Sequence, residues 1–94
     1  MEVVEIRHME DCFDGSLIKE ILLAESILKE QIYALGEGGH IQYFPDFPRP
    51  FYKIRISGLY DLKGIEGNST MRVHLKSPET FPLEKFIDLL SEID

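Results

Sequence analysis

Alternation of apolar and polar side chains from residue 69 to residue 76 is the feature that most constrains this fold. Met71, Val73 and Leu75 alternate with polar residues, and a repeat of two places all three on one face of a β-strand. The same repeat predicts strands over residues 2–9, 40–44 and 51–57. A strand with one apolar face needs a sheet and a layer that covers that face. We therefore expect a mostly antiparallel sheet.

Two other segments have helical spacing. The positions that predict a helix over residues 17–35 are Leu17, Ile21, Leu28, Ile32 and Leu35. Asp14 or Ser16 is expected to cap its start, and Gly36 stands where a left-handed C-cap is expected. A second helix is predicted from Thr80 to the end of the chain, with Pro82 in its first turn. Its apolar stripe consists of Leu83, Phe86, Ile87, Leu90 and Ile93.

These elements give the order β-α-β-β-β-α and an α+β fold class. We expect one domain over residues 1–94, since 94 residues suffice for one modest core. The predicted architecture is a two-layer sandwich, with a sheet of about four strands and both helices on one face. This packing resembles the ferredoxin-like style, although the last strand of that arrangement is missing. Strand order stays open, as does whether residues 51–62 form one bent strand or two.

Charge is unevenly distributed along the chain. The whole sequence has 17 acidic and 10 basic residues, a net charge of −7. Residues 38–76 nevertheless carry six basic and three acidic side chains, a local charge of +3. Free nucleic acid is repelled at long range by such an acidic protein and is an unlikely partner, so an anionic partner is expected to bind in the basic middle of the chain.

Compartment is predicted from cysteine content and hydropathy. Cys12 is the only cysteine, so no internal disulfide forms. No apolar run approaches the roughly 20 residues of a membrane span, and the first residues lack a basic signal-peptide region. These features favour a cytoplasmic location and no membrane association.

The face of the predicted sheet opposite the helices combines cationic and aromatic side chains. The residues that we predict as its contact set are Phe44, Phe51, Lys53, Arg55, Arg72 and His74. Three interpretations stay open. The face is simply solvated, or it is a protein interface, because aromatic residues and arginine are enriched there, or it stacks and neutralises nucleotides or single-stranded nucleic acid.

Other candidate sites carry weaker signals. The thiol of Cys12 is surrounded by acidic residues, which disfavour a reactive thiolate. His8, His40 and His74 have no metal-ligand spacing, and the acidic run near Cys12 lacks the calcium-loop pattern. We therefore predict no catalytic residue, no metal and no cofactor. The proline-rich loop over residues 44–52 is either a stiff crossover or a recognition loop.

The leading functional hypothesis is a small non-enzymatic interaction or accessory domain. It is expected to form a homodimer, or to bind another protein, through the open sheet face. The alternative is a small-ligand module in which the same face binds an anion, a nucleotide or a short single-stranded nucleic acid. An enzyme is not supported by any motif in the sequence.

Overall fold

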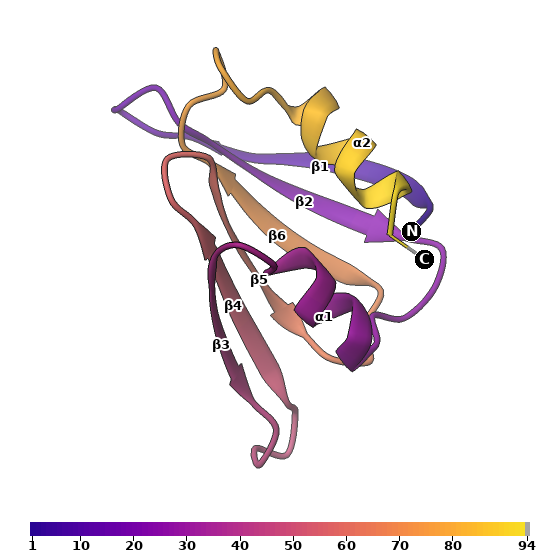
Figure 1. The fold of residues 1–94 in the computed structure, drawn as a ribbon. Helices are drawn as coiled ribbons and strands as arrows, with labels where there is room; N and C mark the ends of the chain where they lie inside the picture. Colours follow the sequence, from indigo (N-terminus) through magenta and orange to yellow (C-terminus); the bar gives the residue numbers. More distant parts are fainter. Residues whose placement is uncertain (94) are drawn as a thin grey trace.

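A six-stranded antiparallel sheet and two short helices form the fold of residues 1–93, which the computed structural model describes (Figure 1). The elements are β1 (Val3–Asp11), β2 (Leu17–Leu23), α1 (Lys29–Leu35), β3 (His40–Phe44), β4 (Phe51–Ile56), β5 (Tyr60–Ile65), β6 (Thr70–Leu75) and α2 (Leu83–Ser91). Across the sheet the strands follow the order β1-β2-β6-β5-β4-β3.

The predicted fold layout was wrong. The order is β-β-α-β-β-β-β-α with six strands, not the four-strand β-α-β-β-β-α arrangement, and it is not ferredoxin-like, although the α+β character holds. The error lies mainly in residues 17–23, which form β2 and not the first two turns of a helix. Because β2 lies between β1 and β6, both of its edges are paired with neighbouring strands. Ile21 and Leu23 point into the core while Ile18 and Leu22 are half-buried on the opposite face, so the strand lacks a repeat of two.

The predicted helix cap is part of a β-turn instead. Gly15 has a φ of 88°, a left-handed conformation that favours glycine. Both the backbone N–H and the hydroxyl of Ser16 donate to Asp14 Oδ1, at 2.9 and 2.6 Å, which is local side-chain bonding typical of aspartate in turns. The β1–β2 hairpin therefore replaces the expected helix start. Of residues 17–35, the helical part is α1, which begins where Leu28 N–H donates to Gln31 Oε1 at 2.8 Å. Gly36 ends this helix with a φ of −92°, so the predicted left-handed cap was wrong.

The remaining predicted elements are found with changed boundaries. Strands are confirmed over residues 40–44 and 70–75. The segment 51–62 contains parts of two strands, β4 and β5, joined by a turn in which Gly58 has a φ of 77°. The last helix is confirmed but begins at Leu83 after Pro82, later than the expected cap at Thr80. Asp94 lies outside the described residues.

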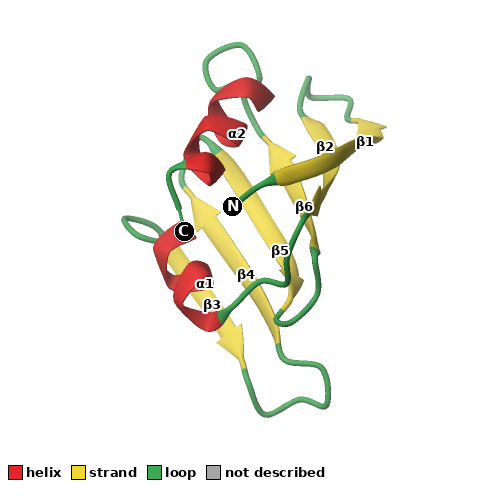
Figure 2. Cartoon of the chain, turned by 90° about the vertical axis from the view of Figure 1, so that its right-hand side faces the viewer, coloured by secondary structure: helices red, strands yellow, loops and turns green. Residues whose placement is uncertain are grey.

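Both helices lie on one face of the sheet and share one core with it (Figure 2). Ile32 and Leu35 come from α1, and Phe86 and Leu90 come from α2. They pack against strand residues that include Ile21, Tyr52, Ile54, Leu62, Met71 and Val73. The opposite face of the sheet, called the open face below, carries neither of the two described helices. Within the described residues, no helix has the length and hydropathy to cross a membrane.

Strand β1 departs from the predicted pattern. Alternation over residues 2–9 predicts Val4 and Ile6 on the apolar face of the strand, yet these residues are 59% and 40% exposed. Irregularities in the β1–β2 register occur between Val3 and Glu5 and between His8 and Glu10. At the first bulge Val3 packs against the core and Val4 lies outside it. From Glu5 to His8 the alternation is kept, and Ile6 is on the helix side of the sheet opposite Ile21.

Candidate functional site

All six residues of the predicted contact set lie on the open face. Lys53, Arg55 and Arg72 are exposed, and their chain neighbours Ile54 and Val73 are buried beneath the helices. Phe44 is paired with Phe51, and His74 is the neighbour of Asp61 across β5 and β6. The set nevertheless divides into two separate groups.

The aromatic group lies near the β3–β4 hairpin loop. The rings of Phe44 and Phe51 are stacked with centroids 4.5 Å apart, and Phe47 packs at 5.2 Å from Phe51. Phe47 is 53% exposed in a loop that contains three prolines. None of these three rings lines the groove described next.

The polar group lines a groove of about 440 Å³ across the middle of the open face. Four basic side chains and one acidic side chain contribute to its lining, a formal charge of +3 with the histidines neutral. The charged members are Lys53, Arg55, Lys63, Arg72 and Asp61. This local charge is opposite in sign to the net charge of −7. A concave surface with an excess of positive charge strengthens the electric field that attracts an anion.

One cross-strand row supplies most of this charge. From β3 to β1 the directly paired residues are Gln42, Lys53, Lys63, Arg72, Glu20 and Arg7. Directly paired side chains in antiparallel strands are close neighbours, and like charges in such positions repel. Within residues 1–93, neither Lys53 nor Lys63 forms an ion pair with a carboxylate within 4.0 Å. In the same part of the chain, Arg72 has only a long ion-pair contact, 3.9 Å from its Nη2 to Glu20 Oε2.

The neighbouring row is neutralised by contrast. Asp61 Oδ1 lies 3.4 Å from Arg55 Nε and 3.2 Å from Lys76 Nζ. Both contacts are ion pairs, and within residues 1–93 this buried oxygen has no hydrogen-bond partner. His40 and His74 stand on either side of the Arg55–Asp61 pair in this row. Anion attraction is therefore concentrated on Lys53, Lys63 and Arg72.

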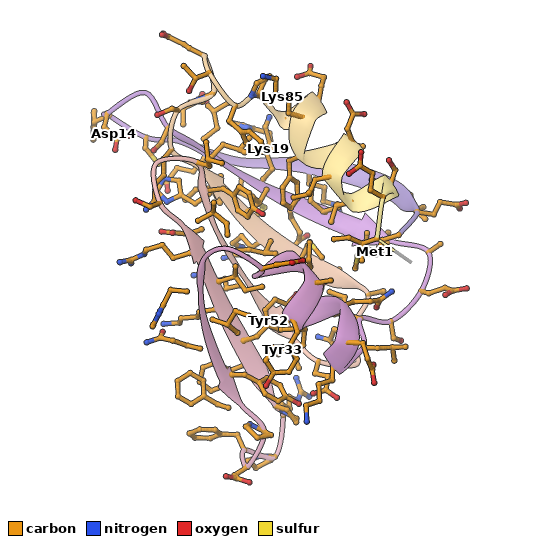
Figure 3. The ribbon with its side chains drawn as sticks, in the orientation of Figure 1. Met1, Asp14, Lys19, Tyr33, Tyr52 and Lys85 are labelled. Carbon is orange, nitrogen blue, oxygen red and sulfur yellow. The ribbon has the colours of Figure 1, made fainter. Side chains whose placement is uncertain are left out.

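A buried hydroxyl holds His74 at the edge of the groove. Ser16 is 1% exposed, and its Oγ lies 2.7 Å from His74 Nε2 while donating to Asp14 Oδ1. Asp14 lies at the tip of the β1–β2 hairpin (Figure 3). The side-chain hydrogen bond from Ser16, followed by the backbone one, lowers the pKa of Asp14 below its ordinary value of 3.8. Because the hydroxyl is enclosed, Ser16 positions the imidazole and does not meet a substrate.

The other candidate residues do not assemble into a site. Cys12 is a half-buried free thiol, and His8 pairs with Asp11 at 3.2 Å. In the described part of the chain, no group of three or more histidine, cysteine, aspartate or glutamate residues is placed to hold a metal ion.

Sequence reasoning missed Lys63 and Asp61. Both belong to β5, which was not separated from β4, so their face could not be assigned. Tyr60 and Leu62 are buried and alternate with Asp61 and Lys63, and that repeat of two was the available signal. Ser16 was missed as a partner of His74 because the two residues are 58 positions apart.

Comparison with known proteins does not add a relative. No family model matches the sequence, and neither curated proteins nor solved structures yield a match. The groove and its charges are therefore the basis for a functional assignment.

Proposed function

We propose that this protein is a binding module that holds a small multivalent anion in the groove of its open face. The observation that carries this proposal is the uninterrupted Lys53–Lys63–Arg72 row. Three adjacent cations without an acid between them oppose folding through mutual repulsion. An anion that bridges them removes this repulsion and gains charge-assisted hydrogen bonds.

The dimensions of the groove support a small ligand. Its volume of about 440 Å³ lies within the roughly 300–1,000 Å³ typical of small-molecule sites. Arg72 offers a planar guanidinium for bidentate contact, and the two lysines offer compact ammonium charges. Phosphate and carboxylate groups carried on one small molecule fit this combination.

The same row weakens the case for a homodimer that stacks one open face on another. Such a dimer brings two cationic rows into one interface, and juxtaposed like charges cost several kcal/mol. A protein contact through the exposed Phe47 and its aromatic neighbours is the second candidate function, because exposed aromatic clusters favour protein partners.

A thermal-shift titration with tripolyphosphate tests the anion proposal. We expect the melting temperature to rise by several degrees relative to sodium chloride of matched ionic strength, because a ligand that binds only the folded state stabilises it. Orthophosphate, with fewer charges, is expected to produce a smaller rise at the same concentration.

A pair of double variants locates the effect. The change Lys53→Ala with Lys63→Ala removes two groove cations, and Lys29→Ala with Lys85→Ala removes two exposed cations on the helices. Both make the net charge equally more negative, but only the groove variant is expected to lose most of the shift. Absence of a shift in the unmodified protein, or equal loss in both variants, overturns the proposal.

A further inference from the structure

Strand β1 is an exposed edge of the sheet, and its two bulges leave residues 5–8 as the regular part. It forms one border of the sheet (Figure 2), and eight of its nine residues are exposed. Among the described elements, only β2 makes extensive contact with it. Ile6 lies opposite Ile21 on the helix side of the sheet, yet it is 40% exposed.

The opposite edge is protected. Strand β3 has only five residues and is followed by a loop with three prolines, features that prevent further strand addition. Tyr43 of β3 packs edge-to-face against Tyr33 of α1 at 6.1 Å. Since free backbone N–H and C=O groups on a sheet edge bind another strand, β1 is the edge available for such contact.

The charges on β1 favour a second copy of the same strand as the partner of this edge. Glu5 and Arg7 lie on the same side of the strand, with Arg7 Nε 3.1 Å from Glu5 Oε2, and they flank Ile6. In an antiparallel pair of two β1 strands centred on Ile6, Glu5 of each copy lies opposite Arg7 of the other. The two isoleucines meet at the two-fold axis on the helix side of the sheet.

Other registers lack this match. A two-fold axis perpendicular to the sheet keeps each face on its own side, so the register can shift only by centring on another residue. Centring on Arg7 brings two arginines together, and centring on Glu5 brings two carboxylates together. The bulges at both ends of the segment confine regular pairing to residues 5–8, so the contact is short.

We propose that two copies of this chain associate through antiparallel pairing of their β1 edges, centred on Ile6. The association leaves both grooves open and is independent of the anion-binding proposal. Its short length makes the dimer weak and dependent on concentration. Four alternating charges, two from each copy, fix its register.

Light scattering and sedimentation across micromolar to millimolar concentrations test this association. The measured mass is expected to rise from 10.9 kDa toward twice that value. A mass that stays at 10.9 kDa throughout this range overturns the proposal.

Two charge reversals provide the decisive comparison. Arg7→Glu places two acids opposite each other in the dimer, and Glu5→Arg places two bases opposite each other, so each variant alone is expected to be monomeric. An equimolar mixture is expected to dimerise, because one strand is then entirely acidic at these positions and the other entirely basic. Circular dichroism verifies that each variant is folded before mixing.

Controls separate this edge from other surfaces. Lys85→Glu makes the same charge change as Arg7→Glu on α2 and is expected to keep the dimer. The groove variant Lys53→Ala with Lys63→Ala is also expected to keep it. Failure of the mixture to associate while the unmodified protein dimerises, or loss of the dimer in the groove variant, overturns the β1 assignment.

Discussion

Ser16 Oγ lies 2.7 Å from His74 Nε2, and this contact joins the β1–β2 hairpin to the lining of the groove. The serine is 1% exposed and directly precedes β2, which pairs with β6, the strand that carries the histidine. A hydroxyl that donates to Asp14 and accepts from an imidazole N–H satisfies both neighbours at once. Loss of this one oxygen therefore affects the hairpin and the groove together.

Ser16→Ala is predicted to destabilise the protein by about 1–3 kcal/mol, because it leaves the His74 ring nitrogen without its hydrogen bond and removes one of the two hydrogen bonds that Ser16 donates to Asp14. Urea unfolding monitored by circular dichroism measures the change. Ser91→Ala, which removes an exposed hydroxyl on α2, is the control and is expected to change stability by less than about 0.5 kcal/mol. A similar small change for Ser16→Ala contradicts a structural role for the contact.

Acid stability is predicted to depend on Asp14. Hydrogen bonds from Ser16 lower its pKa in the folded protein below the ordinary value of 3.8. A carboxyl group with a lowered folded-state pKa stabilises the fold above its ordinary pKa, and this contribution is lost as pH falls through the folded-state value. Asp14→Asn is therefore expected to be less stable than the unmodified protein near neutral pH, with the difference shrinking below pH 3.8.

Unfolding measured at several pH values checks this dependence. Asp46→Asn, in the loop between β3 and β4, is the matched control for loss of one acidic charge. An Asp14→Asn difference that stays constant from neutral to acidic pH contradicts the prediction.

In the absence of a ligand, removal of one cation from the groove is predicted to stabilise the folded protein. Lys63→Gln removes the central cation between Lys53 and Arg72, and a gain of about 0.2–1 kcal/mol is expected at low salt. The gain should decrease as salt screens these exposed charges. Thermal unfolding at low and high salt measures it, with Lys85→Gln as the control. If Lys63→Gln is less stable than the unmodified protein at low salt, repulsion among Lys53, Lys63 and Arg72 does not oppose folding.

Tyr52→Phe is predicted to leave stability unchanged or to raise it by about 1 kcal/mol. Tyr52 is fully buried, and its hydroxyl has no hydrogen-bond partner among the described residues. Burial also raises the pKa of this phenol above its ordinary value of 10.0. Because the substitution breaks no hydrogen bond, urea unfolding should show no decrease in the free energy of unfolding. A loss of more than about 1 kcal/mol would reveal a partner for the hydroxyl.

Sequence alone determined the strands with one wet face and one dry face. In β6, Met71, Val73 and Leu75 must avoid water while Arg72 and His74 need not, so a repeat of two predicts both the element and its faces. The placement of Lys53 and Arg55 on the open face follows from the same rule in β4. Burial of apolar area drives this arrangement whatever the neighbouring strands are.

Tertiary structure decided the identity of β2 and everything that depends on cross-strand pairing. Residues 17–23 have apolar side chains on both faces, and only a place between β1 and β6 makes the extended form preferable to a helix. The Lys53–Lys63–Arg72 row and the Ser16–His74 contact join residues from different strands. Register and strand order, which arise from packing of the whole sheet and not from local preference, bring these side chains together.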